Sequence, residues 1–136
     1  MNSISSDIEL IRLCTRAGIL KPQIISRDKI NWNSSGNYII NLAPSTSDGT
    51  HWVALHIKNK DATYFDSFGE PPPLDVLRFL SDHGIYSYLC NDTQIQDIRS
   101  GYCGQYCVMF LRHMRGTGTS LHKLSVFLKH FLNLQS

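Results

Sequence analysis

Residues 96–107 read QDIRSGYCGQYC, and this stretch is the most informative part of the chain. It leads from a polar loop into an apolar run, and it places Cys103 at the start of that run, flanked by Gly101 and Gly104. We expect a helix over residues 102–115, with the Cys103 thiol in its first turn. Exposed backbone N–H groups and the helix dipole favour negative charge at that end, so the position suits a thiolate.

Two earlier residues are candidates to act with this cysteine. His51 opens a strand-like run at 51–57, and Asp66 lies near the end of a second run at 62–67. If the two runs form an antiparallel hairpin, His51 and Asp66 lie roughly opposite each other. A carboxylate placed there would orient the imidazole and stabilise its charged form. Together with Cys103, the pattern predicts a nucleophile, its base and an orienting acid.

Residues beside these candidates could bind the reacting groups. Gln96, seven residues before Cys103, would donate its side-chain amide N–H to a developing oxyanion, with the Cys103 backbone N–H as second donor. Gln94 is a competing choice for this role. Three more residues are candidates for substrate contact: Trp52, Gly101 and Gly104. The glycines leave space for a substrate backbone, whereas the indole would either narrow the substrate channel or fill the core.

Apolar periodicity and turn signals predict an α+β fold, in which helices pack a small, mainly antiparallel central sheet. The expected strands are 37–42, 51–57, 62–67 and 85–90, and the expected helices are 7–16, 74–83, 102–115 and 120–132. Residues 21–35 are expected to be mostly loop, with Trp32 as core filler. His56 is five residues from His51, hence on the opposite face of a strand, and is expected to be structural.

Length and composition fit one globular domain, residues 1–136, with 42% hydrophobic and 18% charged residues. The start has no signal-peptide pattern and no apolar run is long enough to cross a bilayer, so we expect an intracellular protein without membrane contact. Four cysteines are too few and too scattered for a disulfide framework, and their spacing does not suit a zinc site: Cys14, Cys90, Cys103 and Cys107. We therefore expect reduced thiols, no metal and no required cofactor.

The charges are unevenly distributed. Residues 1–97 contain eight basic and eleven acidic residues, whereas residues 98–136 contain five basic residues and no acidic one. A basic C-terminal third of this kind suits contact with a polyanion such as nucleic acid. The alternative is a pair of solvated helix faces with no partner.

Four blocks of the chain, taken in order, resemble the adenovirus protease (adenain) family and the wider clan that includes the ubiquitin-like-protein proteases. The blocks are GTHWVAL at 49–55, YFDSFG at 64–69, TQIQ at 93–96 and CGQYCVMFL at 103–111. The similarity runs from about residue 8 to residue 114, and it implies a cysteine endopeptidase with an adenain-like α+β fold. Carried over by position, it implies these roles: nucleophile Cys103, general base His51, orienting acid Asp66 and oxyanion donor Gln96.

The chain also departs from that family. Adenain has a glutamate where this chain has Asp66, although aspartate is the form in the ubiquitin-like-protein proteases. The chain is also much shorter after the cysteine helix, which leaves open whether DNA or a viral peptide activates it.

The resemblance further implies a biological role. Compact proteases of this type occur in double-stranded DNA viruses, virophages and virus-like transposons, where they trim capsid and core precursors. We therefore expect a monomeric maturation protease of the virion and the host cytoplasm or nucleus, cutting next to Gly-Gly-type sites. The alternatives are a protease that removes ubiquitin or a ubiquitin-like modifier, a non-catalytic binding module, and a nucleic-acid-binding domain.

Overall fold

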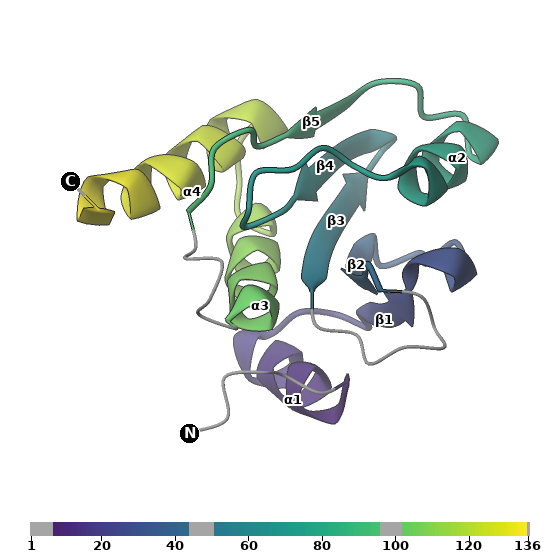
Figure 1. Cartoon of the computed structure of the whole chain (residues 1–136), viewed down its shortest axis with the longest axis horizontal. Helices are drawn as coiled ribbons and strands as arrows, with labels where there is room; N and C mark the ends of the chain where they lie inside the picture. Colours follow the sequence, from purple (N-terminus) through teal and green to yellow (C-terminus); the bar gives the residue numbers. More distant parts are fainter. Residues whose placement is uncertain (1–6, 44–50, 96–101, 136) are drawn as a thin grey trace.

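The computed structural model describes residues 7–43, 51–95 and 102–135, the last four by their backbone only. A five-stranded sheet, in the order β1-β2-β3-β4-β5, forms the centre of the described part (Figure 1). The strands are β1 (Gln23–Ser26), β2 (Asn37–Asn41), β3 (Trp52–Lys58), β4 (Asp61–Phe65) and β5 (Tyr88–Cys90). The helices are α1 (Asp7–Ala17), the short 3-10 helix η1 (Arg27–Lys29), α2 (Leu74–Asp82), α3 (Cys103–Met114) and α4 (Ser120–Gln135).

The sheet is mixed, and the α+β class is confirmed. The two central pairings, β2 with β3 and β3 with β4, are antiparallel, as expected. The two outer pairings, β1 with β2 and β4 with β5, are parallel, which the sequence did not indicate. The expectation that residues 21–35 are mostly loop is wrong for β1, whose four half-buried residues form one edge of the sheet.

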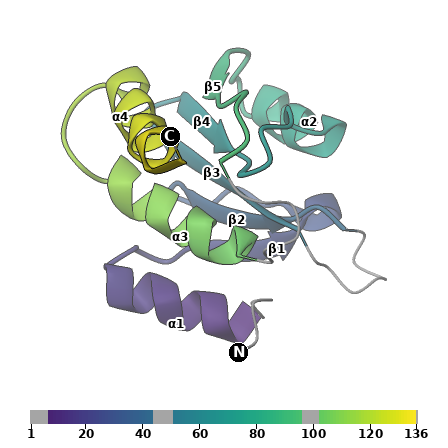
Figure 2. The same cartoon turned by 60° about the vertical axis from the view of Figure 1, so that its left-hand side comes forward.

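Each face of the sheet is covered by a hydrophobic cluster. Trp52 and Ala54 of β3 face a cluster formed with α1, α3 and α4, whereas Val53 and Leu55 face a second cluster with α2. Figure 2 shows α1 and α3 running side by side, with α4 on the opposite side of α3 from α1. Burial on both faces explains why β3 is a nearly continuous apolar run rather than an alternating one.

Helix α3 is central to the larger cluster. Residues of this helix at helical spacing are fully or almost fully buried: Cys103, Cys107, Phe110, Leu111 and Met114. Cys103 is its first residue, so the nucleophile predicted from sequence does lie at the N-terminus of a core helix. Among the described residues, no helix is long and apolar enough to cross a bilayer.

Trp32 is not core filler, contrary to expectation. Its side chain is 49% exposed, and its ring stacks on that of His83 with centroids 4.8 Å apart. The cluster beside it is already filled by Phe79 and Tyr38, whose rings meet edge to face. The tryptophan therefore lies on the surface of that cluster rather than inside it.

The aromatic centre of the larger cluster gives a stability prediction. Phe110 is fully buried, with its ring centroid 5.0 Å from that of Phe65 and 5.8 Å from that of Phe127. Replacing Phe110 by alanine removes these contacts and leaves a cavity, so the free energy of unfolding should fall by about 3–5 kcal/mol in urea denaturation followed by circular dichroism. The neighbouring Met109→Ala, at a 44% exposed position, should cost less than about 1 kcal/mol. Equal losses in the two variants would contradict this account of the core.

Candidate active site

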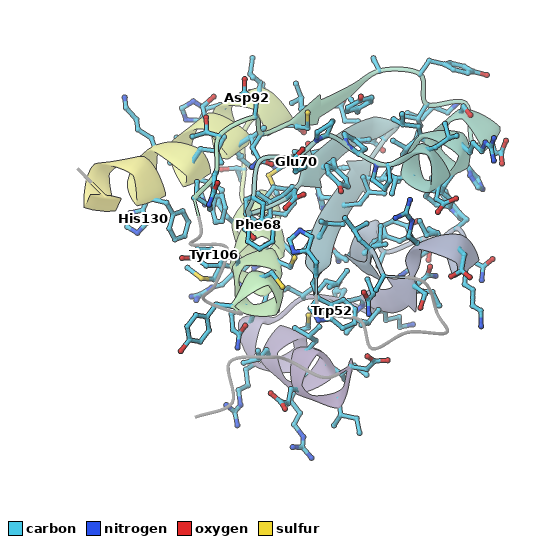
Figure 3. All side chains as sticks on the ribbon, in the orientation of Figure 1. Trp52, Phe68, Glu70, Asp92, Tyr106 and His130 are labelled. Atoms are coloured by element: carbon cyan, nitrogen blue, oxygen red, sulfur yellow. The ribbon has the colours of Figure 1, made fainter. Side chains whose placement is uncertain are left out.

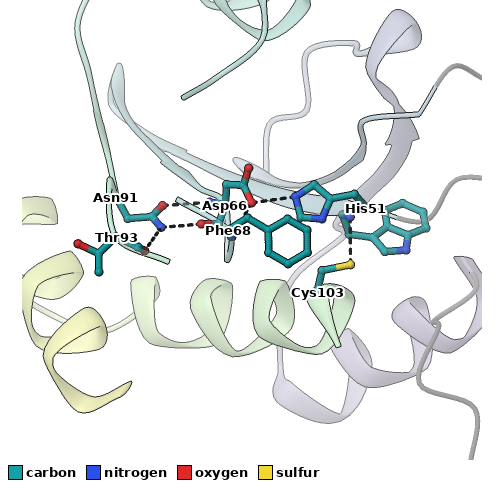
Figure 4. A network of polar contacts seen from close by, with 7 residues as sticks. His51, Asp66, Phe68, Asn91, Thr93 and Cys103 are labelled. Carbon is teal, nitrogen blue, oxygen red and sulfur yellow. Dashed lines mark hydrogen bonds and ion pairs between the residues drawn. The ribbon is translucent and has the colours of Figure 1, made fainter. Parts of the chain in front are cut away.

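His51 and Asp66 are bonded to each other at the ends of neighbouring strands. His51 immediately precedes β3, and its backbone carbonyl accepts a hydrogen bond of 3.0 Å from the Leu42 N–H. Asp66 immediately follows β4, and its Oδ1 lies 2.8 Å from Nε2 of His51 (Figure 4). The predicted contact between the two side chains is therefore present in the structure.

The hairpin register differs slightly from the expected one. Ala54 pairs with Phe65, which puts Asp66 level with residue 53 and His51 two residues further along. Because side chains two residues apart along a strand share a face, the shift keeps both side chains on the same side.

The Asp66 carboxylate is buried and held from several directions. Its side chain is 1% exposed, and Oδ1 also accepts a 2.8 Å hydrogen bond from the Phe68 N–H. The Asn91 side chain clamps the backbone of Asp66: its Oδ1 accepts from the Asp66 N–H at 3.0 Å, and its Nδ2 donates to the Asp66 carbonyl. The donors on Oδ1 compensate the cost of taking the carboxylate out of water, and the Asn91 clamp fixes the backbone that carries it.

Cys103 lies next to the same histidine. It is buried at the N-terminus of α3, and the backbone N–H of Trp52 donates a 3.3 Å hydrogen bond to its Sγ. Figure 4 shows His51 between Asp66 and Cys103. An N–H donor and a helix N-terminus both stabilise negative charge, so the surroundings of Sγ suit a thiolate.

The pKa of His51 reflects both neighbours. Burial alone would lower it, but the interactions with Asp66 and then with Cys103 outweigh burial and raise the pKa from 6.5 to about 9. His51 is therefore charged at neutral pH. Its other ring nitrogen, Nδ1, is buried and forms no hydrogen bond of ordinary geometry among the described residues. With Nε2 bonded to Asp66, Nδ1 is the nitrogen left to exchange a proton with the sulfur or a substrate.

Two predicted site residues, Gln96 and Gly101, lie outside the described residues. Gln94 is described and exposed, so the choice between Gln94 and Gln96 as oxyanion donor stays a prediction. The loop before them is anchored at the site, because the buried Ile95 donates a 2.9 Å backbone hydrogen bond to the carbonyl of Ser67, next to Asp66.

The remaining substrate-contact candidates lie close to Cys103. Gly104 is buried in the first turn of α3. The Trp52 indole is 4% exposed and belongs to the core cluster, between the start of β3 and α1 (Figure 3). Trp52 was expected either to narrow the substrate channel or to fill the core, and in the structure its indole fills the core. What Trp52 contributes to the site is its backbone N–H.

Sequence reasoning missed two residues of the site, Phe68 and Asn91. The Phe68 ring stacks flat on the His51 imidazole, with centroids 4.2 Å apart and planes 6° from parallel. A signal for Phe68 was present, since aspartate often bonds the backbone N–H two residues on. Nothing local in the sequence points to Asn91, which reaches Asp66 from 25 residues away.

The other cysteines have surroundings that oppose reactivity. Burial raises the pKa of Cys14 to about 11 and that of Cys107 well above its ordinary value. Burial also raises the pKa of Cys90, and the charge of Asp92 adds to the shift. A raised pKa keeps the thiol protonated and unreactive. Among the described residues, no group of three or more His, Cys, Asp or Glu side chains is placed to hold a metal ion.

Two basic residues of the C-terminal third, Arg112 and Lys123, and three histidines line a cavity of about 640 Å³ between α3 and α4. Its polar lining consists of Thr117 and five basic or imidazole side chains: Arg112, His113, His122, Lys123 and His130. Lys123 is already used by the fold, because its Nζ donates to the carbonyls of Met114 and Gly116 at the end of α3. Nucleic-acid contact through this surface stays a prediction.

Comparisons with known proteins add little to this geometry. No protein-family model matches the chain, and no curated protein matches it. Among solved structures, it is similar to a crystal structure of the ASFV pS273R protease, with 23% identity and a TM-score of 0.42. The match covers 66% of this chain and 38% of that protease. A likeness at this TM-score assigns neither family nor activity.

The contact between Asp66 and His51 leads to a prediction about the pKa of His51. In Asp66→Asn, which keeps the shape and one acceptor oxygen, the imidazolium loses its main stabilising charge, and its pKa should fall by about one to three units. The measurement is a titration of the imidazole nitrogens by NMR. His56 serves as internal control: it bonds Asn37 instead, burial lowers its pKa to about 4, and Asp66→Asn should leave that pKa unchanged.

The same shift has a consequence for stability. Because the folded-state pKa of His51 is raised, its protonation stabilises the fold fully below about pH 6.5, and this contribution is lost as the pH rises through about 9. If the pKa of His51 lies near its ordinary value both in the unchanged protein and in Asp66→Asn, the pairing of His51 with Asp66 is contradicted.

Proposed function

We propose that this chain is a cysteine endopeptidase. The observation that supports the proposal is the series Asp66, His51, Cys103: a buried carboxylate bonded at 2.8 Å to an imidazole that lies next to a cysteine at a helix N-terminus. A thiolate beside an imidazolium, with a third group orienting the imidazole, is the arrangement that nucleophilic acyl transfer requires.

Each residue then has a definite part in the reaction. The Cys103 thiolate attacks the scissile carbonyl carbon, forming a C–S bond and moving the carbonyl π electrons onto oxygen. When the intermediate collapses, the C–N bond breaks and the His51 imidazolium gives its proton to the departing amine. The neutral imidazole next takes a proton from water as that water attacks the thioester. The acid product leaves, and the thiolate and imidazolium are restored.

The negative oxygen formed in the attack needs hydrogen-bond donors. A helix leaves its first backbone N–H groups without an acceptor in its own turns, so the start of α3 is one proposed source of donors. The Gln96 side-chain amide is the second proposed donor, with Gln94 as the competing choice.

The proposal is tested by labelling with a peptide electrophile that ends in Gly-Gly-vinyl methyl ester, followed by mass spectrometry of the modified residue. We expect selective modification at Cys103, since Cys14 and Cys107 have raised pKa values. In His51→Ala the rate should fall about a hundredfold or more, because the partner of the thiolate is lost. His122→Ala, an exposed histidine on α4, should label like the unchanged protein.

If all four cysteines are labelled slowly and equally, and His51→Ala does not change the rate, the enzyme proposal is wrong and a non-catalytic binding module is favoured. The assay is repeated with added double-stranded DNA, so that a requirement for a polyanion through the basic C-terminal third is detected in the same experiment. Selective labelling of Cys103 that appears only with DNA would support both the enzyme proposal and activation by DNA.

For the substrate, we propose a viral capsid or core precursor cut next to a Gly-Gly-type site; the alternative is a ubiquitin or ubiquitin-like conjugate. The sequence resemblance supports a narrow channel for glycines, and Gly104 lies buried beside the nucleophile. Peptides with Gly-Gly before the scissile bond should be cleaved at least about tenfold faster than matched Ala-Ala peptides, measured as kcat/KM. Equal rates would remove the Gly-Gly proposal, and faster cleavage of modifier conjugates than of any short peptide would favour the alternative.

A further inference from the structure

The turn after β4 carries both Asp66 and Phe68, and both contact His51. The reaction proposed above uses only Asp66. Within this turn, the Gly69 N–H donates to the Asp66 carbonyl at 2.8 Å, and the Phe68 N–H donates to Asp66 Oδ1 at 2.8 Å. That same oxygen lies 2.8 Å from His51 Nε2. The backbone of Phe68 therefore fixes the one oxygen atom on which the orientation of His51 depends.

The side chain of Phe68 meets the same histidine from another direction. Its ring lies 4.2 Å from the imidazole and 6° from parallel, so the two rings are stacked face to face (Figure 4). The face of a phenyl ring carries negative potential and attracts a cation lying within about 6 Å. Since the raised pKa keeps His51 charged at neutral pH, this stack is a contact between an aromatic face and a cation.

Core packing does not explain this placement. Phe68 belongs to neither of the two hydrophobic clusters of the described residues, and its side chain is only half-buried. Its aromatic contact among those residues is with His51. A phenylalanine placed outside the core and flat against a charged imidazole is better explained by that imidazole than by the fold.

The turn is also held in place by its surroundings. Gly69 has φ +77°, and a Cβ atom there would lie 2.9 Å from the backbone nitrogen of Gln94. On the other side of Phe68, the carbonyl of Ser67 accepts the Ile95 N–H. The backbone that carries the Phe68 ring is thus fixed against the loop that follows β5.

We propose that Phe68 is a positioning residue for the candidate active site, which orients the His51 imidazolium with its ring and the Asp66 carboxylate with its backbone. The inference rests on the proposed function for its kinetic consequences, but not for its effect on His51. With the ring in place, the imidazole plane stays aligned with Asp66 on one side and Cys103 on the other. Without it, the imidazole is free to turn and loses part of the stabilisation of its charge.

The first test compares Phe68→Leu, Phe68→Tyr and the unchanged protein by NMR titration of the His51 nitrogens. Phe68→Leu keeps the backbone N–H and removes the ring, so the His51 pKa should fall by about one unit. Phe68→Tyr keeps an aromatic face and should titrate like the unchanged protein. The matched control is Trp32→Leu, which removes an aromatic ring stacked on His83 and should leave His51 unaffected.

A second measurement keeps the proposal testable if Phe68→Leu does not fold. Phenylalanine with fluorine at ring positions 3, 4 and 5, introduced at position 68, nearly preserves the shape but weakens the negative potential of the ring face. The His51 pKa should then fall although the packing is unchanged. An unchanged His51 titration in the folded leucine or fluorinated protein would overturn the proposal.

Kinetics with a Gly-Gly peptide separate positioning from substrate contact. Loss of alignment should lower kcat about tenfold in Phe68→Leu, with KM nearly unchanged, and the basic limb of the pH–rate profile should move to lower pH. A rise in KM alone, with the His51 titration unmoved, would make Phe68 a substrate contact and overturn the positioning role. If the unchanged protein cleaves no peptide, the proposed function fails, whereas the NMR titration still decides the role of Phe68.

Discussion

The hydrogen bond between the buried Asp66 carboxylate and His51 is the constraint on which the rest of the site depends. A carboxylate that is 1% exposed is tolerated only with donors directed at it, and Oδ1 accepts from both the imidazole and the Phe68 N–H. Since Nε2 is committed to this bond, Nδ1 is the nitrogen available on the Cys103 side. The orientation and charge of His51 are thus set by the fold itself, as the proposed role of a preorganised base requires.

The fold supports this contact by bringing the ends of two strands against one helix end. The start of β3 carries His51, the end of β4 carries Asp66, and the Trp52 N–H ties β3 directly to the sulfur of Cys103. Cys103 also belongs to the buried stripe of α3 that includes Cys107 and Phe110. Cys103 is therefore held in place by the same packing that holds the helix.

Local patterns in the sequence predicted the parts of the molecule that depend on local physics. The central strands, the cysteine helix and the hairpin that joins His51 to Asp66 follow from apolar runs and turn signals, and a two-residue error in register was harmless because side chains alternate along a strand. β1 was missed because four half-buried residues give no clear pattern. Asn91 and the Phe68–His51 stack were missed because they are contacts between loops, and Gln96 lies outside the described residues.

A comparison of His51 with His56 shows how contacts made by the fold set the pKa of an imidazole. His51 and His56 are five residues apart, yet the pKa of the first is raised to about 9 and that of the second is lowered to about 4. His51 is partly buried and His56 is buried, and burial lowers the pKa of both. The difference is that His51 has a carboxylate and a cysteine as partners, whereas His56 bonds the neutral Asn37 and feels the positive charges of Lys123 and Lys58. The sequence supplies the imidazole, and the charges that the fold places around it decide whether it is an ion-pair partner or a neutral part of the core.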